Sequence, residues 1–346
     1  MSVDSYTAML QLERISSLLS PWAIRAAATL RLPDLVAEGA DTTSDLATRS
    51  ETDPDALHRL MRHLQILGLF CTTADSRWAL TELGDLLRDD HPLRMCRVLD
   101  QTNEYLRKVN QSTYGLLAAV RAGGAVWDRL HGLSLWDDLA ANSELGRGFS
   151  ELTTFRLALL GPAIARGYDW TTSRHIIDVG GGTGHLLASI LDIQPDLQGT
   201  LVDLPSVITD ATAVLEEANV ADRCVVVPQS FFDVLPRGGD VYLLANILHN
   251  WDNENSAKIL RRCAEAAGSG KRVLLVERVV TDKADENEQD FFVSVSDLSM
   301  LFLLGGRERT EDEFHQLALA TGLRHTATHP LAEYPSMSLL EYTVNG

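Results

Sequence analysis

The sequence predicts an α/β protein of two domains, with a doubly wound, mostly parallel sheet behind a mainly helical N-terminal domain. The chain has 346 residues, more than the roughly 250–300 residues at which single hydrophobic cores stop growing. From residue 174 onward, short apolar runs alternate with helical stretches, the order of a doubly wound sheet. Before residue 174 almost every segment has a helical pattern. These three observations set the fold class.

The N-terminal elements begin with helices over residues 7–39, whose apolar positions lie nearly all round. Such a surface needs a partner to bury it, so we expect a homodimer. Residues 41–70 predict two capped helices, with Asp53 as an N-cap before a proline. Residues 69–84 predict a hairpin. Helix, helix and hairpin in this order are typical of a winged helix.

The sheet follows a mostly helical segment, residues 93–167. The last two apolar runs have no helix between them, so they predict an antiparallel hairpin at the sheet edge. The expected strands cover residues 175–179, 199–203, 223–227, 240–245, 272–277, 324–328 and 338–344.

Composition excludes several classes of function. The formal net charge is −18 at pH 7, which argues against nucleic acid, because nonspecific binding to phosphates needs clustered Lys and Arg. No apolar run is long enough to cross a bilayer, and nothing near Met1 reads as a secretory signal, so we expect a cytosolic protein without a membrane partner. Four scattered cysteines without CxxC spacing predict reduced thiols and no zinc.

A glycine-rich turn joins the first expected strand to a helix in "RHIIDVGGGTGHLLASIL", residues 174–191. Such a turn brings a ligand against exposed N–H groups. The spacing is G-x-G-x-G; His185 stands where the dinucleotide fingerprint needs glycine, and no P-loop lysine follows. Asp178 beside the turn suits an amino group, and Asp203 at the end of the next strand suits ribose hydroxyls. Together they predict a nucleoside that bears an amino acid.

Six segments in order carry a family resemblance: "IDVGGGTGHLLASI", "LVDLP", "PQSFFDVLP", "DVYLLANILHNWDNE", "VLLVERV" and "GGRERTEDEF". The chain resembles the bacterial and plant S-adenosylmethionine-dependent small-molecule O-methyltransferases. The resemblance implies a class I methyltransferase Rossmann-like domain, a winged-helix dimerisation domain, and methylation of a phenolic hydroxyl on an aromatic secondary metabolite of polyketide or aromatic acid type. The expected divisions are a dimerisation domain over residues 1–100, a helical region contributing to the substrate pocket over 101–167, and a catalytic domain over 168–346.

The expected catalytic residues are His249, Glu277 and Glu308. A phenol with a pKa near 10 must lose its proton, and an imidazole with a pKa near 6.5 is a suitable base, both values being about those of free groups. His249 follows the strand 240–245, at the edge where ligands of such sheets bind. The resemblance makes it the base and places both glutamates beside it, from where we expect them to orient the ring from two sides.

The expected ligand contacts come from the same motifs. We expect one of Phe231 and Phe232 to contact the adenine of the cofactor and the other to belong to the core. Asn250 stands where relatives commonly have an aspartate that faces substrate, which indicates a different pattern of hydroxyl groups on the acceptor. Ser230 replaces an acidic residue of many relatives, and Ala245 a basic residue of plant ones, which predicts weaker cofactor binding. The expected cofactor residues are Asp178, Gly180, Gly182, Asp203, Leu204, Ser230, Phe231 and Phe232; the expected substrate residues are Asn250, Asp297 and Met300.

Three alternatives stand beside this interpretation. Asp252 and Glu254 follow His249, but no separate aspartate cluster suits magnesium and the resembled family works without metal, so no metal is expected. A winged-helix DNA-binding regulator conflicts with the acidic chain. The same fold and cofactor can also serve N-methylation, or hydroxylation, decarboxylation or pericyclic chemistry that leaves the methyl group in place.

Overall fold

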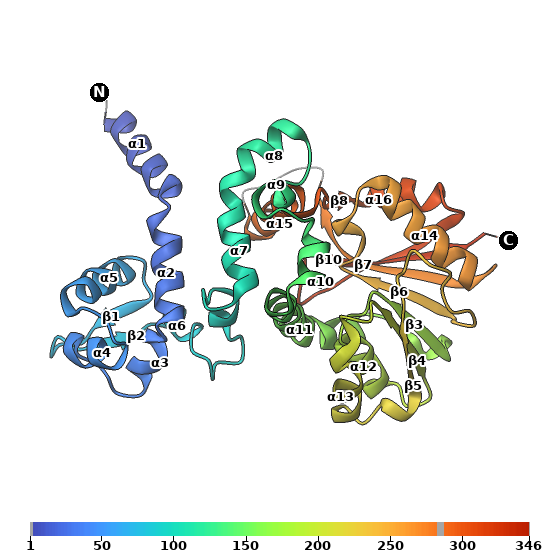
Figure 1. The fold of residues 1–346 in the computed structure, drawn as a ribbon, viewed down its shortest axis with the longest axis horizontal. Helices are drawn as coiled ribbons and strands as arrows, with labels where there is room; N and C mark the ends of the chain where they lie inside the picture. Colours follow the sequence, from blue (N-terminus) through green and yellow to red (C-terminus); the bar gives the residue numbers. More distant parts are fainter. Residues whose placement is uncertain (1–2, 282–286, 346) are drawn as a thin grey trace. The chain divides into compact units, whose positions relative to one another are not determined.

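The computed structural model describes residues 3–281 and 287–345. The chain divides into two compact units, Met1–Arg107 and Lys108–Gly346. The expected divisions at residues 100 and 167 stay predictions. Figure 1 shows a mainly helical N-terminal unit and a C-terminal unit built around a sheet, which confirms the predicted fold class.

The N-terminal unit has the winged-helix order that the sequence predicts. The side chain of Asp53 accepts a hydrogen bond from the N–H of Ala56, as an N-cap of α5. β1 and β2 pair antiparallel, with Phe70 opposite Leu80. Its elements are α1 (Val3–Ser16), α2 (Leu19–Thr29), α3 (Leu32–Ala37), α4 (Thr43–Arg49), α5 (Pro54–Ile66), β1 (Phe70–Thr72), β2 (Trp78–Leu80), α6 (Glu82–Asp85) and the 3₁₀ turn η1 (Met95–Val98).

The first two helices of this unit leave much apolar surface uncovered. Ile15 is 73% exposed, Leu18 64% and Leu19 76%. Apolar side chains at this density on one surface are typical of an interface with another protein chain.

The C-terminal unit carries a sheet in the order β5-β4-β3-β6-β7-β10-β9. The strands β5, β4, β3, β6 and β7 run parallel to one another. The strands β10 and β9 form the antiparallel edge hairpin that the sequence predicts. The short β8 pairs with β7 and was not predicted. The strands are β3 (His175–Val179), β4 (Gln198–Asp203), β5 (Cys224–Pro228), β6 (Val241–Ala245), β7 (Arg272–Val280), β8 (Arg309–Thr310), β9 (Leu323–Pro330) and β10 (Met337–Val344).

Helices cover both faces of this sheet, and two apolar layers result from the alternation of side chains along each strand. Ile176 belongs to the layer that includes residues of α12, and Ile177 to the layer that includes residues of α14. The main helices of the unit are α7 (Glu104–Ser112), which starts before the division, α8 (Leu116–Ala122), α9 (Trp127–His131), α10 (Leu135–Ala141), α11 (Ser143–Arg166), α12 (His185–Ile193), α13 (Ala211–Glu217), α14 (Asn253–Ala267), α15 (Glu288–Leu304) and α16 (Glu311–Leu319).

The chain order reverses between β3 and β6, which is the switch point where open α/β sheets bind ligands beyond the carboxyl ends of their strands. The glycine turn follows β3, and His249 follows β6. No helix in residues 3–281 and 287–345 is long and apolar enough to cross a membrane.

Candidate active site

The glycine turn after β3 takes a backbone conformation that needs glycine. Gly180 has φ +76°, and a Cβ there would lie 2.5 Å from Cδ1 of Ile247. The N–H of Gly182 donates to Oδ2 of Asp203 at 2.8 Å, and the N–H of Leu204 donates to Oδ1 at 2.7 Å. The predicted cofactor residues on β3 and β4 therefore meet, with the Asp203 carboxylate fixing the turn.

Asp178 lies beneath this turn and is 1% exposed. Neither of its carboxylate oxygens has a hydrogen-bond partner among the described residues. Burial, followed by the charge of Asp203, raises the pKa of Asp178 to about 7. A buried carboxylate without a cation is unfavourable. The turn therefore fits a ligand that brings positive charge and hydroxyl groups, such as the cofactor that the family resemblance implies.

The other predicted cofactor residues lie around the same edge. The hydroxyl of Ser230 accepts the N–H of Phe232 at 3.2 Å, so it stabilises its own turn. Both Phe231 and Phe232 pack edge-on against Trp251, with ring centroids 6.0 and 5.0 Å away. The division of the two rings between ligand and core stays a prediction. Leu204 is 42% exposed beside the turn.

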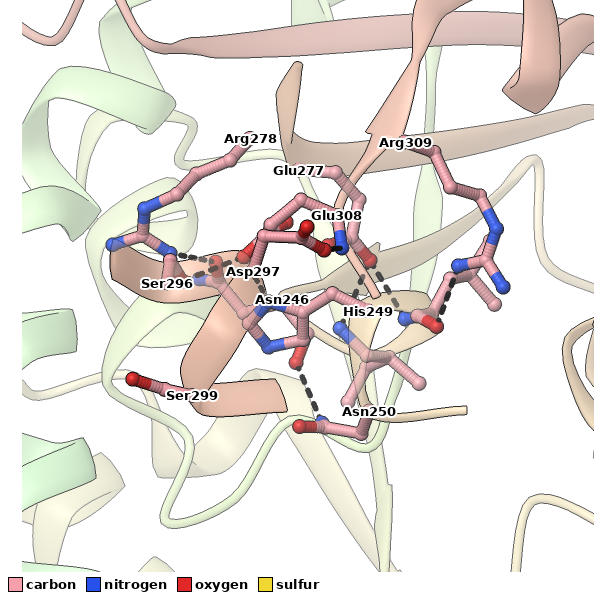
Figure 2. A network of polar contacts seen from close by, with 12 residues as sticks. Asn246, His249, Asn250, Glu277, Arg278, Ser296, Asp297, Ser299, Glu308 and Arg309 are labelled. Carbon is pink, nitrogen blue, oxygen red and sulfur yellow. Dashed lines mark hydrogen bonds and ion pairs between the residues drawn. The ribbon is translucent and has the colours of Figure 1, made fainter. Parts of the chain in front are cut away.

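His249 lies in the 3₁₀ turn η6 (Leu248–Asn250), directly beyond β6. Its Nδ1 is 3.0 Å from Oε1 of Glu308, and the two side chains are 10% and 0% exposed. Figure 2 shows this pair at the centre of a polar network. Burial lowers the pKa of His249, but the hydrogen bond with Glu308 and the charges of Glu277 and Glu308 outweigh it, so the pKa is raised overall. With Nδ1 bound to the carboxylate, Nε2 is the nitrogen left for an acceptor hydroxyl.

Among the described residues, Glu308 hydrogen-bonds the imidazole ring whereas Glu277 bonds backbone groups, so the expected orientation of the ring from two sides stays a prediction. Its Oε1 accepts the backbone N–H groups of Ile247 and Leu248, at 3.0 and 2.7 Å. Its Oε2 is buried without a partner among the described residues, and burial raises the pKa of Glu277. Glu277 thus fixes the backbone that carries His249 and acts on the ring through charge.

Helix α15 supplies two supports for Glu308. The hydroxyl of Ser296 donates to Oε1 of Glu308 at 2.6 Å, and Oδ1 of Asp297 accepts the backbone N–H of Glu308 at 2.8 Å. Asp297 thus helps to hold Glu308, and its expected contact with substrate stays a prediction. Ser296 escaped the sequence analysis because a serine within an apolar helix carries no distinguishing pattern.

The remaining two predicted substrate residues lie on different elements. The side-chain amide of Asn250 donates to the carbonyl of Asn246 at 3.1 Å. Met300 is half-buried on α15, one turn beyond Asp297. No contact brings Met300 to His249 in the described structure, so both substrate roles stay predictions.

The GGRERT segment closes onto the turn that carries the base. A Cβ at Gly306 would lie 2.1 Å from the carbonyl oxygen of His249, so only glycine allows this approach. Arg309 is 1% exposed and donates to the carbonyls of Leu248 and Trp251, at 2.9 and 2.8 Å. It also donates to side-chain oxygens of α14. Sequence reasoning missed this role, because an arginine in a loop usually faces solvent.

Comparison with known families decides the assignment. The O-methyltransferase domain matches residues 114–324, and the O-methyltransferase dimerisation domain matches residues 12–90. The chain belongs to the O-methyltransferase family. The family resemblance stated from the sequence is thereby confirmed, and so is the presence of a dimerisation domain in the N-terminal unit.

Relatives of known activity extend over nearly the whole chain. The O-methyltransferase family includes 2,7-dihydroxy-5-methyl-1-naphthoate 7-O-methyltransferase of Streptomyces carzinostaticus, 37% identical over 96% of this chain and 97% of its own. Aclacinomycin 10-hydroxylase RdmB of Streptomyces purpurascens is 40% identical over 90% and 83%. The crystal structure of the O-methyltransferase NcsB1, in complex with S-adenosylmethionine and 2-hydroxy-5-methyl naphthoic acid, is 37% identical over 96% of this chain and 98% of its own, with a TM-score of 0.84.

Proposed function

We propose that this protein transfers a methyl group from S-adenosylmethionine to a phenolic hydroxyl of an aromatic secondary metabolite. The observation that carries the proposal is the buried His249–Glu308 pair at the carboxyl edge of the sheet, next to the glycine turn. The related naphthoate 7-O-methyltransferase and the NcsB1 complex support the cofactor and an aromatic acceptor.

The residues around the turn would hold the cofactor. Asp203 would bind its ribose hydroxyls, and the negative charge of Asp178 and Asp203 would favour its cationic part. Leu204, Ser230 and one of Phe231 and Phe232 would border the adenine. When bound, S-adenosylmethionine supplies an electrophilic methyl group. No metal ion is part of this proposal.

The protein's own contribution is to remove the acceptor proton. Glu308 binds Nδ1 of His249, so the proton of the neutral ring stays on Nδ1 and the lone pair on Nε2 faces the acceptor. As the hydroxyl becomes an ether, Nε2 takes its proton and the ring becomes an imidazolium. The ionised Glu308 stabilises that cation, and the charge of Glu277 adds to the effect. Asn250, Asp297 and Met300 are proposed to border the acceptor.

Two other reactions deserve a test. The relative RdmB is named as a hydroxylase, and another relative, 30% identical, is an 8-amino-8-demethylriboflavin N,N-dimethyltransferase of Streptomyces davaonensis. A neutral amine attacks before it loses a proton, so N-methylation makes less use of a base. The buried His249–Glu308 pair favours transfer to oxygen, because only there does the reaction depend on taking a proton from the acceptor.

The oligomeric state, the cellular location and the absence of other partners are proposed separately from the reaction. We expect a homodimer, because the exposed apolar surface of α1 and α2 lies in the unit that matches the dimerisation domain. The mass in solution by light scattering checks this, and a monomer would contradict it. The cytosolic location, and the absence of nucleic-acid and membrane partners, stay predictions from the sequence.

The decisive experiment is intact-mass detection of product. Wild type and His249→Ala are incubated with S-adenosylmethionine and a panel of phenolic polyketides and hydroxylated aromatic acids. A product heavier by one methylene unit, and a loss of at least about a hundredfold in the variant, support the proposal. Gain of an oxygen atom without formation of S-adenosylhomocysteine would instead indicate hydroxylation, and equal rates in the two proteins would remove the base from the mechanism. Thermal unfolding and S-adenosylhomocysteine binding control for the integrity of the variant.

A further inference from the structure

Two arginines border the network around His249, and their hydrogen bonding differs (Figure 2). Arg309 is buried, and its donors are taken up by backbone carbonyls and side-chain oxygens at 2.8 to 3.2 Å. Arg278, next to Glu277 on β7, has one side-chain hydrogen bond to the described residues, with Oδ1 of Asn246, and its length of 3.5 Å makes it weak. Arg309 is therefore a structural residue, whereas Arg278 has donors to spare.

Arg278 also has no ion pair with any residue that the structure describes. Within the described parts of the chain, no carboxylate oxygen lies within 4 Å of its guanidinium, although the chain has 48 acidic and 30 basic residues. The side chain is half-buried, so water reaches only part of it. A guanidinium offers five N–H donors in a planar fork that matches a carboxylate. None of the described residues is the carboxylate partner that this chemistry favours.

The position of Arg278 links it to the reaction site. Its positive charge acts on both His249 and Glu308, and in each case it lowers the pKa of the group. Its neighbour Asn246 has φ +53°, a left-handed conformation that asparagine tolerates better than most residues, and lies three residues before His249. The guanidinium is thus at the same carboxyl edge of the sheet as the base.

We propose that Arg278 binds a carboxylate of the acceptor, and hence that the substrate is a hydroxylated aromatic acid rather than a neutral phenol. The inference rests on the proposed function, since it places the acid group of the methyl acceptor. The carboxylate would form a two-pronged pair with the guanidinium and orient the aromatic ring, with its hydroxyl toward Nε2 of His249. Arg278 is on this account a specificity-determining residue.

Pairing would also change the strength of the base. In the free protein the charge of Arg278 opposes protonation of His249. A bound carboxylate neutralises that charge, so the imidazole becomes a stronger base when an acid occupies the site. The rate of methylation should therefore rise with pH at a higher pH for the carboxylic acid substrate than for its neutral ester.

The test compares a matched set of ligands: 3-hydroxy-2-naphthoate, its methyl ester and 2-naphthol. Their affinities are measured by isothermal titration calorimetry in the presence of S-adenosylhomocysteine, so binding is read without turnover. The proteins are wild type, Arg278→Met and Arg278→Lys. As a control, Arg324→Met removes an exposed charge from β9, away from Arg278. Arg324 lies opposite Thr343 on β10, and Thr343 lies opposite Arg272, which is at the other end of β7 from Arg278.

We expect wild type to bind the acid at least about 10-fold more tightly than the ester, since a hydrogen-bonded charge pair contributes roughly 10- to 100-fold. Arg278→Met should abolish this preference, Arg278→Lys should keep part of it, and Arg324→Met should keep all of it. Any of three results would overturn the inference. Wild type could bind acid and ester equally, the preference for the acid could survive in Arg278→Met, or the acid could fail to bind at millimolar concentration. Methylation of the same three compounds is measured separately: an acid preference in binding without methyl transfer would reject the proposed function, not the carboxylate site.

Discussion

Replacing Glu308 by glutamine tests the central contact of the site while preserving its shape. The carboxylate accepts hydrogen bonds from Nδ1 of His249 at 3.0 Å and from Ser296 at 2.6 Å. A hydrogen bond to a charged group is worth about 1.5–3 kcal/mol, and about 1.36 kcal/mol corresponds to tenfold in rate. Because the imidazolium forms only during the reaction, the loss of the charge should lower kcat by roughly 10- to 150-fold.

A second effect of Glu308→Gln makes the loss larger. The new amide is a donor as well as an acceptor, so it can donate to Nδ1 and leave the ring proton on Nε2. That tautomer cannot accept the phenolic proton, and inversions of this kind reduce rates by up to about 10⁴-fold. We therefore expect a loss between about 10-fold and 10⁴-fold, with a smaller change in KM.

The pH dependence of the same variant gives an independent reading. His249 is a base only when neutral, so activity rises as pH passes upward through its pKa, which lies above its ordinary value in the wild type. Glu308→Gln removes two of the causes that raise this pKa, and the acid limb should move to lower pH.

The assay is the initial rate of methyl transfer from pH 5 to 9, with Glu333→Gln as the matched control. Glu333 is exposed and pairs only with Arg166 on the surface among the described residues, so it should behave as wild type. A loss of less than about fivefold for Glu308→Gln, or an acid limb that does not move, would refute the account of the pair.

Three further changes test the supports of the base. Ser296→Ala removes a 2.6 Å hydrogen bond and should lower kcat by roughly 5- to 10-fold. Ser299→Ala should leave kcat unchanged, because among the described residues the Ser299 hydroxyl bonds only a carbonyl of its own helix. Steady-state rates compare the two variants. Gly306→Ala places a Cβ 2.1 Å from a backbone carbonyl oxygen and should lower both activity and Tm. Gly124→Ala is the control and should change neither, because no atom lies within 4 Å of a Cβ there. Calorimetry and rate assays compare the two variants. Glu277 has a raised pKa, so the contribution of this group to stability should be lost as pH rises from about 4.5 through that raised pKa. Glu277→Gln should flatten this fall in denaturant titrations at pH 5 and 8, and an unchanged slope would reject the explanation.

Much of the fold was predictable because the signals are local. Apolar runs of β-branched residues between helical stretches indicate strands, and all seven expected strands are present. The glycine turn was predictable for the same reason, since positive φ at Gly180 and Gly182 requires glycine. The short β8 was not predictable, because two residues carry no period and pair with β7 only once the GGRERT segment is in place.

The candidate site was predictable only in part, because its contacts join distant segments. The family resemblance pointed to His249, Glu277 and Glu308, but the two glutamates have the same chemistry and the sequence does not distinguish their partners. The structure separates them by direction: Glu308 reaches the ring, while Glu277 reaches backbone N–H groups. Ser296 adds a contact across 12 residues of chain, and no local pattern announces it.

The balance of charge around His249 explains why so many groups are needed. Burial alone would lower its pKa and leave a weak base, and two buried carboxylates without further contacts would themselves take up protons. Glu308 stays ionised because Ser296 and the histidine bond it, and the charge of Arg278 also favours the ionised form. Glu277 keeps a raised pKa and is held by the backbone. Glu308 thus strengthens the base by a hydrogen bond and by charge, whereas Glu277 acts on it by charge and also shapes the turn that presents it. A change at Glu308 should therefore act mainly on kcat, and a change at Glu277 on both kcat and stability.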